Sequence, residues 1–143
     1  MPGYIETHRS AVRLWECDEM GHLNVMYYMS RMSDAGFYLM VLVGLTRDYM
    51  KETGAGMAAV EHVIRYKREL MSGDIVAIES GILDVSAKTL RFYHRMLKLP
   101  SGELSATMEG VTVHFDRQAR RSTPMPEKMR QLAETYRVVR NET

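Results

Sequence analysis

The sequence predicts an α+β fold in which a curved antiparallel β-sheet wraps around one long central α-helix. A segment with helical periodicity, residues 25–44, comes early in the chain, and four strand-like segments with short turns follow it. A sheet of that size has an apolar face that must be covered, and the long helix is the available cover. We therefore expect the sheet to curl around the helix.

The first elements are an extended stretch and the long helix. Residues 6–15 alternate loosely between apolar and charged side chains, which is typical of a strand. Asn24 is a suitable N-cap for the helix, and Gly44 is a suitable end. Gly36 lies mid-helix at a cost of about 1 kcal/mol relative to alanine, so we expect another backbone to approach closely there. The helical periodicity runs through Met26, Met29, Ser33, Phe37, Met40, Val41 and Gly44.

Strand patterns dominate the rest of the chain, after a short helical piece at residues 46–56. The predicted strands are residues 58–70, 74–85, 88–98 and 103–115. The third alternates most clearly, because its even-numbered residues 90–96 are Leu, Phe, His and Met. MSGD, VSAK and LPSGE are turn signals between the strands, so we expect an antiparallel meander. Pro126 begins a predicted terminal helix over residues 126–139.

Length and composition limit the class of protein. A chain of 143 residues, 45% hydrophobic and 26% charged, is expected to form one globular domain over residues 1–143. A net charge of +1 gives no reason to expect a nucleic-acid partner. The longest apolar run, residues 37–45, is shorter than the roughly 20 residues of a membrane span, and the N-terminus lacks a signal-peptide pattern. We expect a cytoplasmic protein with no membrane partner. The one cysteine, Cys17, excludes an internal disulfide and argues against a thiolate zinc site.

A polar cluster, WECDEMGHLN, stands directly before the long helix. Asp18, Gly21, His22 and Asn24 fall within seven positions of it. Helix N-termini have unpaired N–H groups and a positive dipole end, which suit a carbonyl oxygen that becomes negative during attack. Asp18 beside such an oxyanion hole can attack an acyl group or remove a proton from water, and Gly21 permits a tight turn. The structural alternative is that Asp and Asn are only caps and that His22 only donates or accepts hydrogen bonds.

The segment ECDEMGHLNVMYYMSRMSDA resembles the signature of the 4-hydroxybenzoyl-CoA thioesterase family, whose members have the hotdog fold, a curved sheet around a central helix. The resemblance implies an acyl-CoA thioesterase that works without a metal or cofactor, as a homodimer or homotetramer. Asp18 takes the place of the catalytic carboxylate. Val25 takes the place of the residue whose backbone N–H polarises the thioester carbonyl, and His22 and Asn24 would position the thioester or the water.

The resemblance continues along the strands. HVIRYKRELMSGD, LDVSAKTLRFYHRM, SATMEGVTVHFD and RRSTPMP are most similar to thioesterase domains linked to carnitine breakdown, which act on betainyl-CoA. The implied substrate is betainyl-CoA or the CoA ester of another small acyl group. The residues expected to bind it are Gly21, Tyr28, Glu61, His62, Lys88, Arg120 and Arg121, of which the three basic residues would hold the CoA phosphates. Ordinary strand polarity and solvated basic turns are the structural alternatives.

Other functions stay open from the sequence. A hotdog enoyl-CoA hydratase or dehydratase also pairs an acid with a histidine, as Asp18 and His22 would be paired. A non-catalytic acyl-CoA-binding protein is the third alternative, although binding alone has little need of a carboxylate. His62, His94 and His114 lie on predicted strands, but no motif brings them together, so we expect no metal site. A single hotdog has an exposed sheet edge, so we expect two chains to pair there and to share the pocket.

Overall fold

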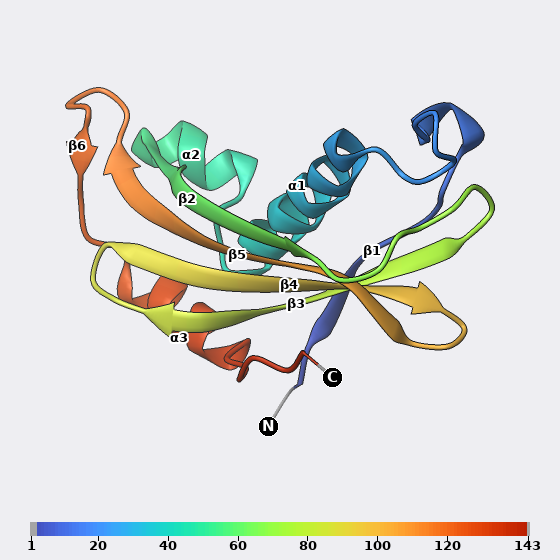
Figure 1. Ribbon diagram of the computed structural model, residues 1–143. Coiled ribbons are helices and arrows are strands. Elements are labelled where there is room, and N and C mark those ends of the chain that lie inside the picture. The colour runs from blue at the N-terminus through green and yellow to red at the C-terminus, as the bar shows by residue number, and fades with distance from the viewer. Residues whose placement is uncertain (1–2, 143) are drawn as a thin grey trace.

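The computed structural model of the protein describes residues 3–142, and its elements follow the predicted order (Figure 1). They are β1 (Ile5–Ala11), the 3-10 turn η1 (Leu14–Glu16), α1 (Val25–Leu42), α2 (Arg47–Thr53), β2 (Ala55–Tyr66), β3 (Ile75–Val85), β4 (Thr89–Leu99), β5 (Glu103–Asp116), β6 (Arg121–Ser122) and α3 (Glu127–Thr135). The sheet curves around α1, so the predicted α+β hotdog architecture is confirmed (Figure 1).

The strands pair antiparallel in the order β1–β3–β4–β5–β2, with β6 beside the end of β5. Strands β3, β4 and β5 form the predicted meander, but the prediction is wrong for β2, which lies beyond β5. Residues 67–74 are a crossing connection and not a hairpin turn. The Lys67 N–H donates to Ser105 O at 2.8 Å, and Leu70 O accepts from the Leu23 N–H at 2.7 Å. This connection leaves β1 and β2 as the two edges of the sheet.

Helix α1 buries a different face from the one that its periodicity predicts. Its buried residues are Tyr28, Arg31, Met32, Ala35 and Leu39. Met26, Phe37 and Val41, from the predicted stripe, are 60, 74 and 54% exposed. The helix is apolar around most of its circumference. The spacing of its apolar residues therefore predicts that the segment is helical, but it does not indicate which face of the helix packs against the sheet. Of the helices within residues 3–142, none has the length and apolar character needed to cross a membrane.

The inner face of β4 packs against α1 as predicted. Leu90, Phe92 and Met96 belong to the buried core, and His94 between them is fully buried. Nε2 of His94 lies 3.8 Å from the position that a Cβ on Gly36 would occupy. What approaches Gly36 is therefore a side chain of the sheet, and the backbone approach expected from the sequence is wrong.

Helix α3 lies beside β3 (Figure 1), and its buried residues Met129 and Ala133 belong to the same core as α1. The segment after α3 covers part of the outer face of the sheet, where Arg140 bonds to Glu109 of β5. Helix α3 is shorter than the terminal helix predicted from the sequence. After it, the Ile82 N–H donates to Tyr136 O and the Val138 N–H donates to Ile82 O, both at 2.9 Å. These bonds cover the edge of β3 that β1 leaves open. The Val138 side chain fills the space above Gly81, where a Cβ would lie 2.4 Å from it.

Candidate active site

The predicted polar cluster folds into a small hairpin, which we call the Asp18 hairpin, residues 17–23. Cys17 and Leu23 form an antiparallel bridge, and the Asp18 N–H donates to His22 O at 2.8 Å. Gly21 has a φ of 84°, a left-handed conformation that is costly for residues with a Cβ. The tight turn expected at Gly21 is present, and it brings Asp18 and His22 opposite each other.

The Asp18 carboxylate is held by its own hairpin. Its Oδ1 accepts from the Met20 N–H at 2.9 Å and from the His22 N–H at 3.2 Å. Within residues 3–142, no hydrogen bond or ion pair to Oδ2 is found. One oxygen therefore fixes the carboxylate, while the other is free to meet a substrate or a water molecule.

Helix α1 begins two residues after the hairpin. Asn24 is its N-cap as predicted, because Asn24 Oδ1 accepts from the Met26 N–H at 3.0 Å. The N–H of Val25, the first helical residue, has no acceptor in the described part of the chain, and Val25 is 60% exposed. A backbone donor at the positive end of the helix dipole is thus left unpaired close to the hairpin.

Two further predicted residues lie around the helix start. The backbone of His22 bridges to Met71, and its half-buried ring has no hydrogen bond within residues 3–142. Tyr28 is almost fully buried: its hydroxyl donates to Arg68 O at 3.3 Å, and its ring packs edge-on against Tyr66 with centroids 5.1 Å apart. Burial raises the Tyr28 pKa. Tyr28 therefore forms part of the wall between α1 and the end of β2.

The other predicted residues lie further away in the same chain. Glu61 and His62 are exposed on the edge strand β2. Lys88 lies in the β3–β4 turn, and Arg120 and Arg121 lie at the β5–β6 turn. The Asp18 hairpin is bonded to Leu70 and Met71, in the connection that leads into the start of β3, whereas Lys88 follows the end of β3. The 11 residues of β3 span about 35 Å. The two ends are also on opposite sides of the molecule in Figure 1. A single chain does not bring the basic residues to Asp18.

Two residues beside the hairpin were not predicted from the sequence. Glu16, which precedes it, and Arg31 of α1 form a buried ion pair, with Arg31 Nη2 2.8 Å from Glu16 Oε1. Hydrogen bonds from Arg31 hold the pKa of the Glu16 carboxyl below its ordinary value. An arginine among the apolar residues of a helix was the available signal, because a buried cation requires an acid nearby.

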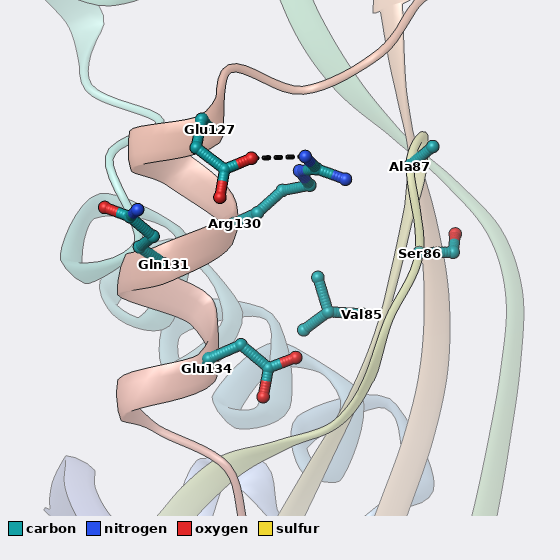
Figure 2. A pocket seen from close by; sticks show the side chains of 7 residues that line it. All are labelled: Val85, Ser86, Ala87, Glu127, Arg130, Gln131 and Glu134. Carbon is teal, nitrogen blue, oxygen red and sulfur yellow. Dashed lines mark hydrogen bonds and ion pairs between the residues drawn. The ribbon is translucent and has the colours of Figure 1, made fainter.

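A hollow of about 300 Å³ lies between α3 and the β3–β4 turn on the outer side of the molecule. Figure 2 shows its charged side chains, of which Glu127 and Arg130 pair with each other. None of the lining residues belongs to the Asp18 hairpin. Within residues 3–142, no group of three or more His, Cys, Asp or Glu side chains is placed to hold a metal ion. His114 bonds instead to the Tyr49 hydroxyl and to Thr123 O, each at 2.8 Å.

Comparison with known proteins gives a family match across most of the chain. The model of the thioesterase-like superfamily matches residues 12–132. The L-carnitine dehydrogenase/betainyl-CoA thioesterase of Agrobacterium fabrum is 31% identical over 122 residues, which are 85% of this chain and 25% of that protein. The acyl-acyl carrier protein thioesterase ATL3 of Arabidopsis thaliana is 27% identical over 76% of this chain and 57% of that protein. The chain therefore spans a quarter of one relative and somewhat more than half of the other.

Solved structures share the fold. The hypothetical protein SAV2348 from Staphylococcus aureus, solved in complex with CoA, superposes with a TM-score of 0.86 at 22% identity. The match covers 95% of this chain and 86% of that one. At this level of identity, the likeness establishes the hotdog architecture and leaves the chemistry to the site.

Proposed function

We propose that this chain, which belongs to the thioesterase-like superfamily, hydrolyses an acyl-CoA to a free acid and coenzyme A. The observation that carries the proposal is the position of the Asp18 hairpin. A carboxylate with one uncommitted oxygen stands just before a helix whose first N–H is unpaired within residues 3–142. Thioester hydrolysis needs these two groups, a base or nucleophile and an oxyanion donor.

Asp18 can act by either of two routes. As a base, its Oδ2 removes a proton from water while the water oxygen attacks the thioester carbonyl. As a nucleophile, Oδ2 attacks the carbonyl itself and forms an anhydride, which water then hydrolyses. In both routes the C–S bond breaks, and the leaving thiolate gains a proton to give coenzyme A.

The start of α1 supports the developing charge. The Val25 N–H donates to the carbonyl oxygen as it becomes an oxyanion, and the positive end of the helix dipole adds to this effect. Asn24 Oδ1 is occupied by the cap, so only the amide N–H groups of Asn24 remain to orient the thioester or the water. The His22 ring, opposite Asp18 in the hairpin, is the second orienting group in this proposal.

The acyl group is betainyl or another small group in this proposal. Support comes from the Agrobacterium relative, whose name includes betainyl-CoA thioesterase. Aromatic faces bind a trimethylammonium group well. Two aromatic pairs flank the helix start: Trp15 with Tyr27 at 5.4 Å, and Tyr28 with Tyr66 at 5.1 Å between ring centroids. Trp15 and Tyr66 are 71 and 50% exposed, so both can meet a ligand.

The complete site requires a second copy of the chain in this proposal. Edge strand β2 exposes Val60 and Tyr66, and helix α1 exposes Phe37 and Val41. Unpaired edges and contiguous apolar surface favour association. Pairing two β2 edges would remove one open edge of each copy and give a homodimer, from which a homotetramer can be built.

Two-fold pairing also accounts for the position of the basic residues. Antiparallel pairing about a two-fold axis sets the start of each β2 beside the end of the other. The start of β2 pairs with the end of β5, close to Arg121. The other end of β2 is Tyr66, whose ring contacts Tyr28 near the start of α1. The assembly therefore brings Arg121 of one copy toward Asp18 of the other, as a CoA substrate spanning both would need.

The first test measures thiol release from a panel of acyl-CoAs with a thiol-reactive dye. The panel contains betainyl, short straight, long straight and aromatic acyl groups, together with an enoyl-CoA. Release from betainyl-CoA or another small acyl-CoA is expected. Hydration of the enoyl-CoA without thiol release would support a hydratase, and tight binding without any reaction would support a binding protein.

A mixing experiment tests the shared site. Asp18→Asn and Arg121→Gln chains are unfolded together and refolded, so that mixed dimers form. If the site is shared between chains, about a quarter of all sites contain both native residues and regain the wild-type KM. If each site uses one chain, no wild-type site forms, and the mixture shows only the sum of the two variants.

A further inference from the structure

The hydrogen-bond network of Arg31 is larger than a simple ion pair. Its Nη1 and Nη2 bind Glu16 Oε2 and Oε1 at 2.9 and 2.8 Å. The remaining donors reach Ser10 Oγ at 2.9 Å, Ala11 O at 2.9 Å and Tyr27 O at 3.2 Å. Arginine has five N–H groups, and each has an acceptor here. One side chain thus joins the end of β1, the turn before the hairpin and helix α1.

Glu16 connects this network to the Asp18 hairpin. Its carboxylate binds Arg31 and also accepts from the Arg13 N–H at 2.8 Å. Its backbone carbonyl accepts from the N–H of Asn24, the N-cap of α1, at 2.9 Å. Glu16 and Asn24 are therefore the base of the hairpin, one residue outside the bridge between Cys17 and Leu23.

The location of this network has a consequence for the reaction. The carboxylate of Asp18 and the N–H of Val25 belong to different local structures, a hairpin and a helix. Their separation depends on how the base of the hairpin is attached to the helix. Glu16 and Arg31 make that attachment with two parallel charge-assisted bonds, a rigid arrangement with defined orientation.

We propose that Glu16 and Arg31 are positioning residues, which set the Asp18 carboxylate against the Val25 N–H for thioester hydrolysis. The inference rests on the proposed function and assigns these two residues a role in its rate. Neither residue touches the substrate. Since they act through the hairpin, their loss lowers kcat, because misplacement of a reacting group by about 1 Å costs about 100-fold in rate. KM should stay within about threefold of the wild-type value, because the contacts with the substrate are unchanged.

Two variants separate positioning from folding. Glu16→Gln keeps the size of the side chain but replaces one acceptor of the Arg31 fork with a donor. In the double variant Glu16→Met with Arg31→Met, no charge is left buried, and apolar replacement of a buried pair commonly preserves stability. Glu79→Gln is the control for loss of a glutamate–arginine ion pair away from the hairpin, because Arg95 Nη2 and Nε both donate to Glu79 Oε1, at 2.7 and 3.0 Å.

The experiment measures kcat, KM, urea unfolding and amide hydrogen exchange for the wild type and the three variants. We expect kcat to fall about 100-fold in Glu16→Gln and in the folded double variant, which we call the hairpin variants because they loosen the base of the hairpin. In Glu79→Gln, kcat should fall less than about twofold. The Met20 and His22 amides, which bond to Asp18 Oδ1, should exchange faster in the hairpin variants, with β4 amides unchanged.

The outcomes separate this inference from the proposed function. A folded double variant with wild-type kcat and unchanged exchange at Met20 and His22 would overturn the positioning role. Absence of thiol release from any acyl-CoA in the wild type would overturn the proposed function instead. In that case, hydrogen exchange alone decides whether Glu16 and Arg31 hold the hairpin.

Discussion

Stability of this fold depends on pH through the buried His94. Burial between α1 and the sheet lowers the His94 pKa from 6.5 to about 3, and the nearby His62 adds to this effect. Nδ1 of His94 bonds to the Ser80 hydroxyl, whereas Nε2 has no partner among residues 3–142. A charged ring would place an N–H without an acceptor in an apolar site. Acidification should therefore destabilise the folded state.

The size of the effect follows from the two pKa values. Between pH 6.5 and pH 3, the unfolded chain binds a proton at His94 that the folded chain does not bind. The free energy of unfolding therefore falls as the pH decreases through this window, and the contribution of His94 is complete above it. Within this window, each pH unit changes the free energy of unfolding by about 1.4 kcal/mol. Protonation of His94 alone should therefore lower the free energy of unfolding by about 2 kcal/mol between pH 8 and pH 5.

Urea unfolding of the wild type and His94→Gln at the two pH values measures this contribution. Glutamine retains an amide that can bond to Ser80 but does not titrate. The loss of stability between pH 8 and pH 5 should be about 2 kcal/mol smaller in the variant. His8, whose pKa is also lowered by burial, is present in both proteins, so its contribution cancels. An equal loss in both proteins would refute the reasoning.

Three other predictions concern packing, capping and substrate affinity. Gly81→Ala places a Cβ 2.4 Å from a Val138 methyl and should lower the free energy of unfolding by about 1–3 kcal/mol in urea; wild-type stability would show that the C-terminal segment does not pack there. Asn24→Ala should cost about 1 kcal/mol through loss of the cap, while Asn24→Asp should keep it, and equal thermal midpoints for the two would contradict the capping role. Lys88→Gln and Arg121→Gln should raise KM for acyl-CoA with little change in kcat, and the difference from wild type should shrink as salt is added. An unchanged KM at low salt would exclude these residues from CoA binding.

Local patterns in the sequence predict the local structure of this chain well. Asn24 is the N-cap, Gly21 makes the turn, and Leu90, Phe92 and Met96 alternate into the core as expected. Each of these features depends on residues within a few positions of one another. Periodicity and turn chemistry act over that range.

Features that depend on distant residues were missed. The place of β2 beyond β5 is decided by pairing between residues about 50 positions apart, which no local pattern contains. The buried face of α1 could not be chosen because the helix is apolar on several sides. Glu16 and Arg31 are 15 positions apart and meet only when the hairpin folds back on the helix. The basic residues expected to bind CoA were individually exposed as predicted, but their separation from Asp18 appears only in the folded chain.

The central claim is that Asp18 drives thioester hydrolysis, and kcat of Asp18→Asn tests it most directly. Asparagine retains the Oδ1 acceptor for the Met20 and His22 N–H groups, so the hairpin should keep its shape while it loses the base or nucleophile. Asp34→Asn, at an exposed carboxylate of α1, is the control. With the best acyl-CoA at saturation, kcat should fall by a factor of about 10² to 10⁴ in Asp18→Asn and by less than about twofold in Asp34→Asn. A folded Asp18→Asn protein that releases thiol at the wild-type rate would contradict the claim.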